Sequence, residues 1–288
     1  MVSGLWASGL ASLGVHMLAV CAVPQARQGG LSLPAFRVRI EALPIEGISA
    51  DLSGLTYNAQ SDTLFGVVNR PQAVVEISTE GRLLRRIALE GARDIEGITH
   101  VEGSRFVVVD EATHRISWFT IEPGTTRIDL GAAPFFTLDL GGFANMGVEG
   151  VSWDQKAGTL LLSQEMLPAR VLAIDGLEET ARGDGLQLAI RKCALDLPLG
   201  PSFADFSALS AHDATGNLLL LSHMTGAVAE FSPAGEPVGL MLLWAGRHGL
   251  KKSVPQAEGI AVGKDGDLYI VSEPNLFYRF SPQAARAW

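Results

Sequence analysis

The chain has 288 residues, 47% of them hydrophobic and 18% charged, which allows a sizeable core and excludes a disordered composition. Its formal net charge of −9 argues against a nucleic-acid partner, because such a partner requires a basic footprint on the protein. The 32 glycines indicate many turns between short strands.

The first 22 residues contain no Lys, Arg, Asp or Glu. A stretch of this length is typical of a signal-peptide core or of a membrane anchor. Residues 18–21 (LAVC) also approximate a lipoprotein box, although no basic residue precedes the hydrophobic core as it usually does. We interpret residues 1–30 as the leader of an exported chain. Its cleavage, lipidation or retention stays open, and a wrongly assigned start or a buried N-terminal helix is the alternative.

A repeated pattern follows, in which a polar residue and a small residue enter a hydrophobic strand. The small residues are Gly54, Gly97, Gly150, Ala208 and Gly259. The intervals between them are 43, 53, 58 and 51 residues, and about 40–50 residues is typical of a propeller blade of four strands. In each copy a second, apolar strand and a third strand follow. The repeat therefore predicts an all-β, five-bladed β-propeller that forms a single domain over residues 35–283.

The fifth copy lacks a fourth strand, because the chain ends soon after Phe280. Residues 35–43 form an unassigned strand of the right type before the first copy. We expect this N-terminal strand to complete the last blade, which would close the ring and cover both free edges. Six blades are the alternative, with an extra element around residues 176–204, where we interpret residues 178–182 as an inserted loop or helical turn.

Three stretches carry a family resemblance: residues 51–58 (DLSGLTYN), residues 221–223 (LSH) and residues 255–280, which include PQAEG and VSEPNLFYRF. They are similar to the SdiA-regulated (YjiK-like) family, and the similarity covers about residues 36–283. The resemblance implies a β-propeller behind an N-terminal hydrophobic segment in a bacterial envelope protein. It implies no particular reaction. We accordingly expect the protein in the periplasm or anchored to the cell membrane.

Two polar positions recur in every copy, one where the first strand starts and one where the second strand ends. The first position holds Ser53, Glu96, Glu149, Ser207 and Glu258, and the second holds Arg70, Glu111, Glu165, His223 and Glu273. Since the two strands form an antiparallel hairpin, both positions should lie at the same end of the blade. The sequence therefore predicts a polar rim around one mouth of the central channel.

Six glutamates occupy this rim, with Arg70 and His223 as the offsetting side chains. Asp51, Asp94 and Asp205 lie two residues before the first position and add carboxylates. Carboxylates a few Å apart raise one another's pKa or recruit a cation, and oxygen ligands suit Ca²⁺ or Mg²⁺. We predict Glu96, Glu149 and Glu258 as metal ligands and the residues of the second position as ligand-binding residues. The alternative is that these residues cap turns at a water-filled mouth.

These observations favour an exported or membrane-anchored propeller, expected to be a monomer, that binds a small molecule or an envelope protein with help from a cation. A metal-dependent hydrolase of phosphoesters or lactones is the alternative. His223 follows Ser222, but the Gly-x-Ser-x-Gly turn of serine hydrolases is missing from the sequence. Lys251 and Lys252, with Arg247, form a small basic loop that we expect to be solvated.

Overall fold

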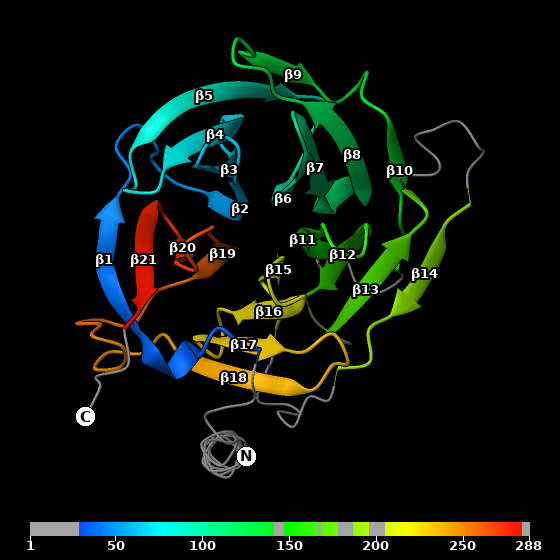
Figure 1. Ribbon diagram of the computed structural model, residues 1–288. Coiled ribbons are helices and arrows are strands. Elements are labelled where there is room, and N and C mark those ends of the chain that lie inside the picture. The colour runs from blue at the N-terminus through cyan, green and yellow to red at the C-terminus, as the bar shows by residue number, and fades with distance from the viewer. Residues whose placement is uncertain (1–28, 141–146, 166–168, 178–186, 196–204, 284–288) are drawn as a thin grey trace, which may run out of the picture.

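The computed structural model of the protein describes residues 29–140, 147–165, 169–177, 187–195 and 205–283. In these residues five sheets stand in a ring around a central axis (Figure 1). This confirms the predicted five-bladed β-propeller and excludes the six-bladed alternative for the described part of the chain. The described residues around 176–204 supply the outer strand of the third blade, and the insertion predicted at residues 178–182 lies outside the described residues.

Each blade is a sheet that begins at the axis and runs outward. Blade one consists of β2 (Leu52–Asn58), β3 (Thr63–Asn69), β4 (Gln72–Ser78), β5 (Leu83–Glu90) and β9 (Arg127–Asp129). Blade two consists of β6 (Ile95–Glu102), β7 (Arg105–Asp110), β8 (Arg115–Thr120) and β10 (Phe135–Thr137), with the 3₁₀ helix η2 (Glu111–Thr113) after β7. Blade three consists of β11 (Val148–Asp154), β12 (Thr159–Gln164), β13 (Arg170–Asp175) and β14 (Ala189–Lys192). Blade four consists of β15 (Ala208–His212), β16 (Asn217–Ser222), β17 (Ala227–Phe231) and β18 (Pro237–Leu242).

Blade five joins the two ends of the propeller. It consists of β19 (Ala257–Val262), β20 (Leu268–Ser272), β21 (Leu276–Pro282) and, as its outermost strand, β1 (Phe36–Pro44), which follows the short 3₁₀ helix η1 (Leu33–Ala35). β1 runs antiparallel to β21, with Phe36 opposite Pro282 and Pro44 opposite Leu276. The predicted closure by the N-terminal strand is therefore confirmed. Closure pairs the edge that β21 would otherwise leave open.

Blade one has an outer strand that the repeat did not predict. β9 comes from the connection between β8 and β10 and pairs with β5 in parallel, with Ala88 opposite Arg127 and Glu90 opposite Asp129. A strand of three residues has too few positions to show the period of two that identifies strands in a sequence.

The core consists of five apolar clusters, each lying between two neighbouring blades. Between blades one and two, for example, the rings of Phe65 and Phe106 lie 4.8 Å apart. Every residue of β12 and of β16 is buried, because blades cover both faces of these second strands. This double burial explains their continuous apolar sequences. The helices in the described part of the chain are too short to cross a membrane.

The small residue of the repeat allows the inner strands to approach one another around the axis. A Cβ atom on Gly97 would lie 2.5 Å from the carbonyl oxygen of Glu149, and one on Gly54 would lie 2.9 Å from that of Glu96. A Cβ on Gly259 would likewise lie 2.9 Å from the carbonyl oxygen of Gly54. The glycines are therefore required by backbone contact between blades.

Candidate functional site

The glutamates of the first position stand at breaks in the pairing of the first hairpin. In blade two Ile95 lies opposite Asp110 and Gly97 opposite Val109, so Glu96 between them has no partner in the ladder. The same shift occurs at Glu149 and at Glu258. A bulge of this kind re-aims a side chain and is common next to functional sites. In blade four, which carries Ser207, the register runs without a shift.

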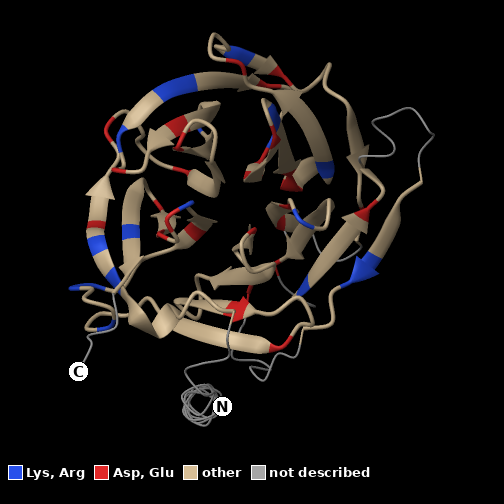
Figure 2. Cartoon of the chain, in the orientation of Figure 1, with Lys and Arg blue, Asp and Glu red and all other residues tan. Residues whose placement is uncertain are grey.

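The bulged glutamates and their neighbours form one electrostatic cluster at the predicted rim. Glu96 interacts with Asp94 and Glu111, and Glu258 interacts with Glu96, Glu273, Asp205 and Glu165. Acidic segments accordingly lie on the inner strands around the axis (Figure 2). We call these side chains the acidic mouth: Asp94, Glu96, Glu111, Glu149, Glu165, Asp205, His223, Glu258 and Glu273.

Burial in this cluster disfavours the charged form of several carboxyls. Burial, and after it the nearby carboxylates, raise the pKa of Glu258 to about 8. The pKa of Glu96 rises to about 8 for the same reasons, although the hydroxyl of Ser53 donates a hydrogen bond of 2.9 Å to its Oε2 and opposes the rise. At neutral pH these two side chains therefore hold protons that ordinary glutamates would lose.

Glu149 and Glu165 form a hydrogen-bonded carboxyl pair. Burial raises the pKa of Glu149, and the charge of Glu165 raises it further, so Glu149 keeps the proton and donates it to Glu165. Burial also raises the pKa of Glu165, whereas the hydrogen bond from Glu149 opposes this rise. One proton is thus shared between two carboxyls, as expected where like charges are forced together.

Asp205 is held rigidly where it faces the mouth. It is fully buried, and its carboxylate accepts hydrogen bonds from the hydroxyl of Ser222, from the backbone N–H of His223 at 3.0 Å and from that of Met224 at 3.3 Å. Three donors from the turn after β16 therefore fix the orientation of this carboxylate.

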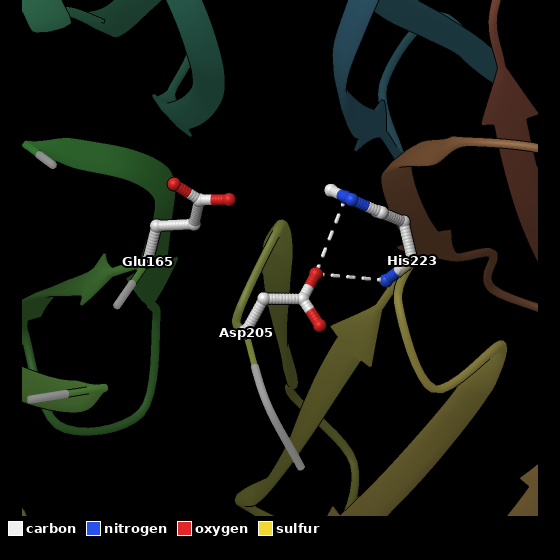
Figure 3. Close-up of side chains that lie close together, drawn as sticks. All are labelled: Glu165, Asp205 and His223. Atoms are coloured by element: carbon white, nitrogen blue, oxygen red, sulfur yellow. Dashed lines mark hydrogen bonds and ion pairs between the residues drawn. The ribbon is translucent and has the colours of Figure 1, made fainter. Parts of the chain in front are cut away.

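His223 completes a group of three potential metal ligands with Glu165 and Asp205. One ligand atom from each side chain lies within 4.8 Å of the others, which is the closest such set among the described residues (Figure 3). The carboxylate of Glu165 points from blade three toward the other two side chains. Nδ1 of His223 is buried and makes no hydrogen bond, although it lies 3.2 Å from Oδ2 of Asp205 and 3.5 Å from Oε1 of Glu258. Two carboxylates and an imidazole are a donor set suited to a divalent metal.

The family described as SdiA-regulated matches residues 28–281, which include the whole ring. The chain belongs to the SdiA-regulated family. The fold of this family member is also similar to the crystal structure of a glutaminyl cyclase from Myxococcus xanthus, with a TM-score of 0.56, 16% identity, and coverage of 85% of this chain and 95% of that chain. A luciferin-regenerating enzyme matches with a TM-score of 0.53 and 12% identity, covering 87% of this chain and 97% of that chain. At such identities the likeness concerns the fold.

The structure brings most of the predicted site residues of this SdiA-regulated protein together. Glu96, Glu149 and Glu258, predicted as metal ligands, lie in the acidic mouth but not in the tightest group of ligands. Glu165 and His223, predicted to bind a ligand, belong to that group. Their partner Asp205 was noted in the sequence only as one further carboxylate.

The remaining members of the second position lie in different surroundings. Glu111 is buried, and its Oε1 accepts a hydrogen bond of 2.9 Å from the backbone N–H of Gly147. Glu273 is partly buried beside Glu258. Arg70 does not offset the glutamates as expected, because its side chain is 83% exposed and pairs with Asp51 at 2.9 Å. At blade one the positive charge of Arg70 therefore lies at the surface beside Asp51, and not among the buried glutamates.

Sequence reasoning missed the residue just before each second position. Asn69 donates from Nδ2 to the carbonyl oxygen of Ile95 at 3.1 Å and to Oε1 of Glu96 at 3.2 Å, and its Oδ1 accepts from the N–H of Ile95 at 2.8 Å. Asp110 similarly accepts from the N–H of Arg93 at 2.8 Å. These last residues of the second strands hold the loops that lead into the inner strands. Their polar character at the end of an apolar strand was the available signal.

Proposed function

We propose that this SdiA-regulated protein binds a divalent cation at its acidic mouth, through Glu165, Asp205 and His223, and uses the ion to hold a ligand or partner. Carboxylate oxygens favour Ca²⁺ or Mg²⁺, and these are the ions that we propose first. An imidazole nitrogen is a donor that Mn²⁺ and Zn²⁺ accept readily, so both belong in the same test.

The observation that carries the proposal is the orphaned Nδ1 of His223. It is a buried polar atom without a hydrogen bond, and it lies between the carboxylates of Asp205 and Glu258. An unsatisfied buried group costs about 1–3 kcal/mol, so its retention calls for a compensating partner. A cation would supply that partner and would also reduce the repulsion among the surrounding carboxylates.

Thermal unfolding of the full chain provides the test. After treatment with EDTA and dialysis, the melting temperature is measured at pH 8 with millimolar Ca²⁺, Mg²⁺, Mn²⁺ or Zn²⁺. An ion at about 100 times its Kd stabilises the folded state by about 2.7 kcal/mol, which corresponds to a rise of roughly 5–10 °C for a domain of this size. The absence of a rise with all four ions would overturn the proposal.

Variants locate the ion. Glu165→Gln and His223→Gln should each reduce the rise by more than half, because each removes one ligand. Glu102→Gln is the matched control, since its side chain is 70% exposed at the far end of β6 and pairs with Arg105. Isothermal titration of the same variants gives the affinity directly. A rise that persists in both ligand variants would place the ion elsewhere.

Hydrolysis at the same site is the second candidate, and the pair of Glu149 and Glu165 favours it. A carboxyl that holds a proton beside a metal-binding group could serve as a general acid or base. Phosphoester and lactone substrates are therefore tested with and without the ion that raises the melting temperature. Activity that requires the ion and disappears in Glu149→Gln supports a hydrolase. Ion binding without turnover of either class supports the binding function.

We also propose that the propeller acts as a monomer outside the cytoplasm, either released from its hydrophobic leader or anchored by it. Support for this location comes from the uncharged first 22 residues and from the membership of the family whose resemblance implied an envelope protein. The bound species would be a small molecule or another envelope protein. Fractionation of cells that express the full chain, followed by mass measurement of its N-terminus, tests the location.

A further inference from the structure

The flank of blade five carries a concentration of positive charge that the acidic mouth does not explain. Two segments contribute, residues 36–41 in β1 and residues 247–252 in the loop between β18 and β19. Together they contain five basic side chains and one acidic side chain. We call this set the basic flank: Arg37, Arg39, Glu41, Arg247, Lys251 and Lys252.

Hydrogen bonds hold the two segments side by side. The backbone N–H of Val38 donates to the carbonyl oxygen of His248 at 2.8 Å, and the ring of His248 contacts the carbonyl oxygen of Phe36 at 3.0 Å. Further along β1, Oε1 of Glu41 accepts from the backbone N–H of Lys251 at 2.6 Å and from that of Lys252 at 3.2 Å. The basic side chains therefore share one surface.

These charges face solvent and are not neutralised by the described carboxylates. Arg39, Arg247, Lys251 and Lys252 are exposed, and Arg37 is partly buried. In the described part of the chain, the ion pairs all involve other basic residues. Glu41, the acidic member, is engaged by backbone N–H groups. The protein as a whole has a formal net charge of −9, so this flank is opposite in sign to the rest of the molecule.

The flank lies next to the place where the N-terminal segment joins the ring. The backbone N–H of Leu31 donates to both carboxylate oxygens of Glu230 on β17, at 2.9 and 3.1 Å, and the carbonyl oxygen of Gly29 accepts from Asn217 at 3.1 Å. The chain then passes through η1 into Arg37, whose guanidinium donates to the carbonyl oxygen of Pro34 at 3.1 Å. Residues 23–28 separate the uncharged stretch from Gly29, a span of at most about 25 Å.

We propose that the basic flank docks on the anionic headgroups of a phospholipid bilayer. Basic side chains beside a hydrophobic segment are attracted to such headgroups, each by an amount that corresponds to about a fivefold change in affinity. The acidic remainder of the molecule is repelled by the same surface, so the contact also orients the ring. In this orientation blade five lies against the membrane, and the acidic mouth, which lies at the axis and not on the flank, stays accessible. This proposal does not depend on cation binding at the mouth.

Flotation of the full chain with vesicles tests the docking. Vesicles of phosphatidylcholine alone are compared with vesicles that contain about one third phosphatidylglycerol, at 50 and 500 mM NaCl with EDTA present. Hydrophobic binding by residues 1–22 contributes to both kinds of vesicle, so the ratio of the two partition coefficients isolates the basic flank. The wild-type ratio should exceed about 10 at low salt and approach 1 at high salt, because salt screens exposed charges.

Substitutions with the same change in charge provide the control. The triple variant Arg39→Gln, Lys251→Gln and Lys252→Gln should lower the ratio about 100-fold or to 1, whichever is reached first. The control triple variant Arg127→Gln, Arg191→Gln and Lys192→Gln changes exposed residues of β9 and β14 and should leave most of the ratio intact. Glu41→Gln keeps an acceptor for the loop while it removes the negative charge, and it should raise the ratio.

A rise of the ratio in Glu41→Gln would be a gain of binding, which a misfolded variant is not expected to show. A ratio of 1 for the wild-type protein, or equal losses in the two triple variants, would overturn the proposal. Binding of the flank to heparin without a preference for anionic vesicles would also overturn it and would indicate a polyanionic macromolecule instead.

Discussion

The two ends of the central axis are both polar, but their polar groups are satisfied in different ways. At the end away from the acidic mouth, the inner hairpins close in turns with local hydrogen bonds. Oδ1 of Asp154 accepts from the N–H of Lys156 at 3.0 Å, and Nδ1 of His212 contacts the hydroxyl of Thr215 at 2.8 Å. An ion pair of 2.9 Å joins Lys264 to Asp62. Each of these groups has a partner within a few residues or on the next blade.

At the mouth the carboxyls of several blades meet one another instead. Glu149 must share a proton with Glu165, and Nδ1 of His223 lacks a hydrogen bond. The comparison shows that polarity at a channel end is weak evidence for a site. Buried groups that remain unsatisfied or repel one another are stronger evidence, because their cost needs compensation.

The largest expected effect comes from removal of Asp205. Asp205→Ala leaves the buried hydroxyl of Ser222 and two partly buried backbone N–H groups without their acceptor, and it should destabilise the protein by about 3 kcal/mol in urea unfolding at pH 6. Asp154→Ala removes an acceptor of two backbone N–H groups in a partly exposed turn and should cost about 1 kcal/mol. Equal losses in the two variants would remove the distinction between the ends.

The pH dependence of stability distinguishes the ends by the pH range in which each acts. Glu96 and Glu258 have a folded-state pKa of about 8 against an ordinary value of 4.5, so the folded state binds more protons than the unfolded state between these pH values. These two groups should therefore make the stability of the metal-free protein fall as pH rises, and their joint contribution is about 2 kcal/mol between pH 7 and 8.5. At the other end burial lowers the pKa of His100 and His212, which makes stability rise with pH, but only below about pH 6.5. Burial also raises the pKa of Asp213 there, which opposes this rise in acid solution.

Urea midpoints in EDTA at a series of pH values measure this slope. The double variant Glu96→Gln and Glu258→Gln should reduce the slope above pH 7 but not abolish it, because Glu149 keeps its proton in the folded state over the same pH range. A saturating cation should reduce the slope in the wild-type protein. If the stability of the wild-type protein does not fall between pH 7 and 8.5, the buried glutamates of the mouth do not have raised pKa values.

The smallest expected effect concerns two glycines of blade two. Gly97→Ala places a Cβ 2.5 Å from the carbonyl oxygen of Glu149 and should cost about 2 kcal/mol through overpacking of the ring. Gly103→Ala lies in the turn at the other end, where a Cβ would have free space but φ is +56°, and should cost about 1 kcal/mol. Melting curves of both variants give the difference. A smaller loss of stability in Gly97→Ala than in Gly103→Ala would show that the inner strands at the mouth can move apart to make room for a side chain.

The spacing of one short pattern along the chain was sufficient to predict the blades, the ring closure and the end at which the polar rim lies. These features depend on local periodicity and on hairpin geometry, which each segment carries by itself. The closure by β1 followed because one repeat was a strand short and an earlier strand was unassigned. β9 could not be predicted in this way, since its pairing with β5 depends on a long connection that returns to the preceding blade.

The composition of the site was decided only by the tertiary structure. The sequence placed Arg70 and His223 in equivalent positions, yet one side chain points to solvent and the other is held beside Asp205 and Glu258. Bulges turn the glutamates toward the axis, and the turn after β16 fixes Asp205, which the repeat marked only as a neighbour. Distances between side chains on different blades depend on how closely the inner strands approach, and that approach is a property of the closed ring. The sequence by itself thus determined which strand ends lie at the mouth, and the folded ring decided which of their side chains enter it and which of those lie close together.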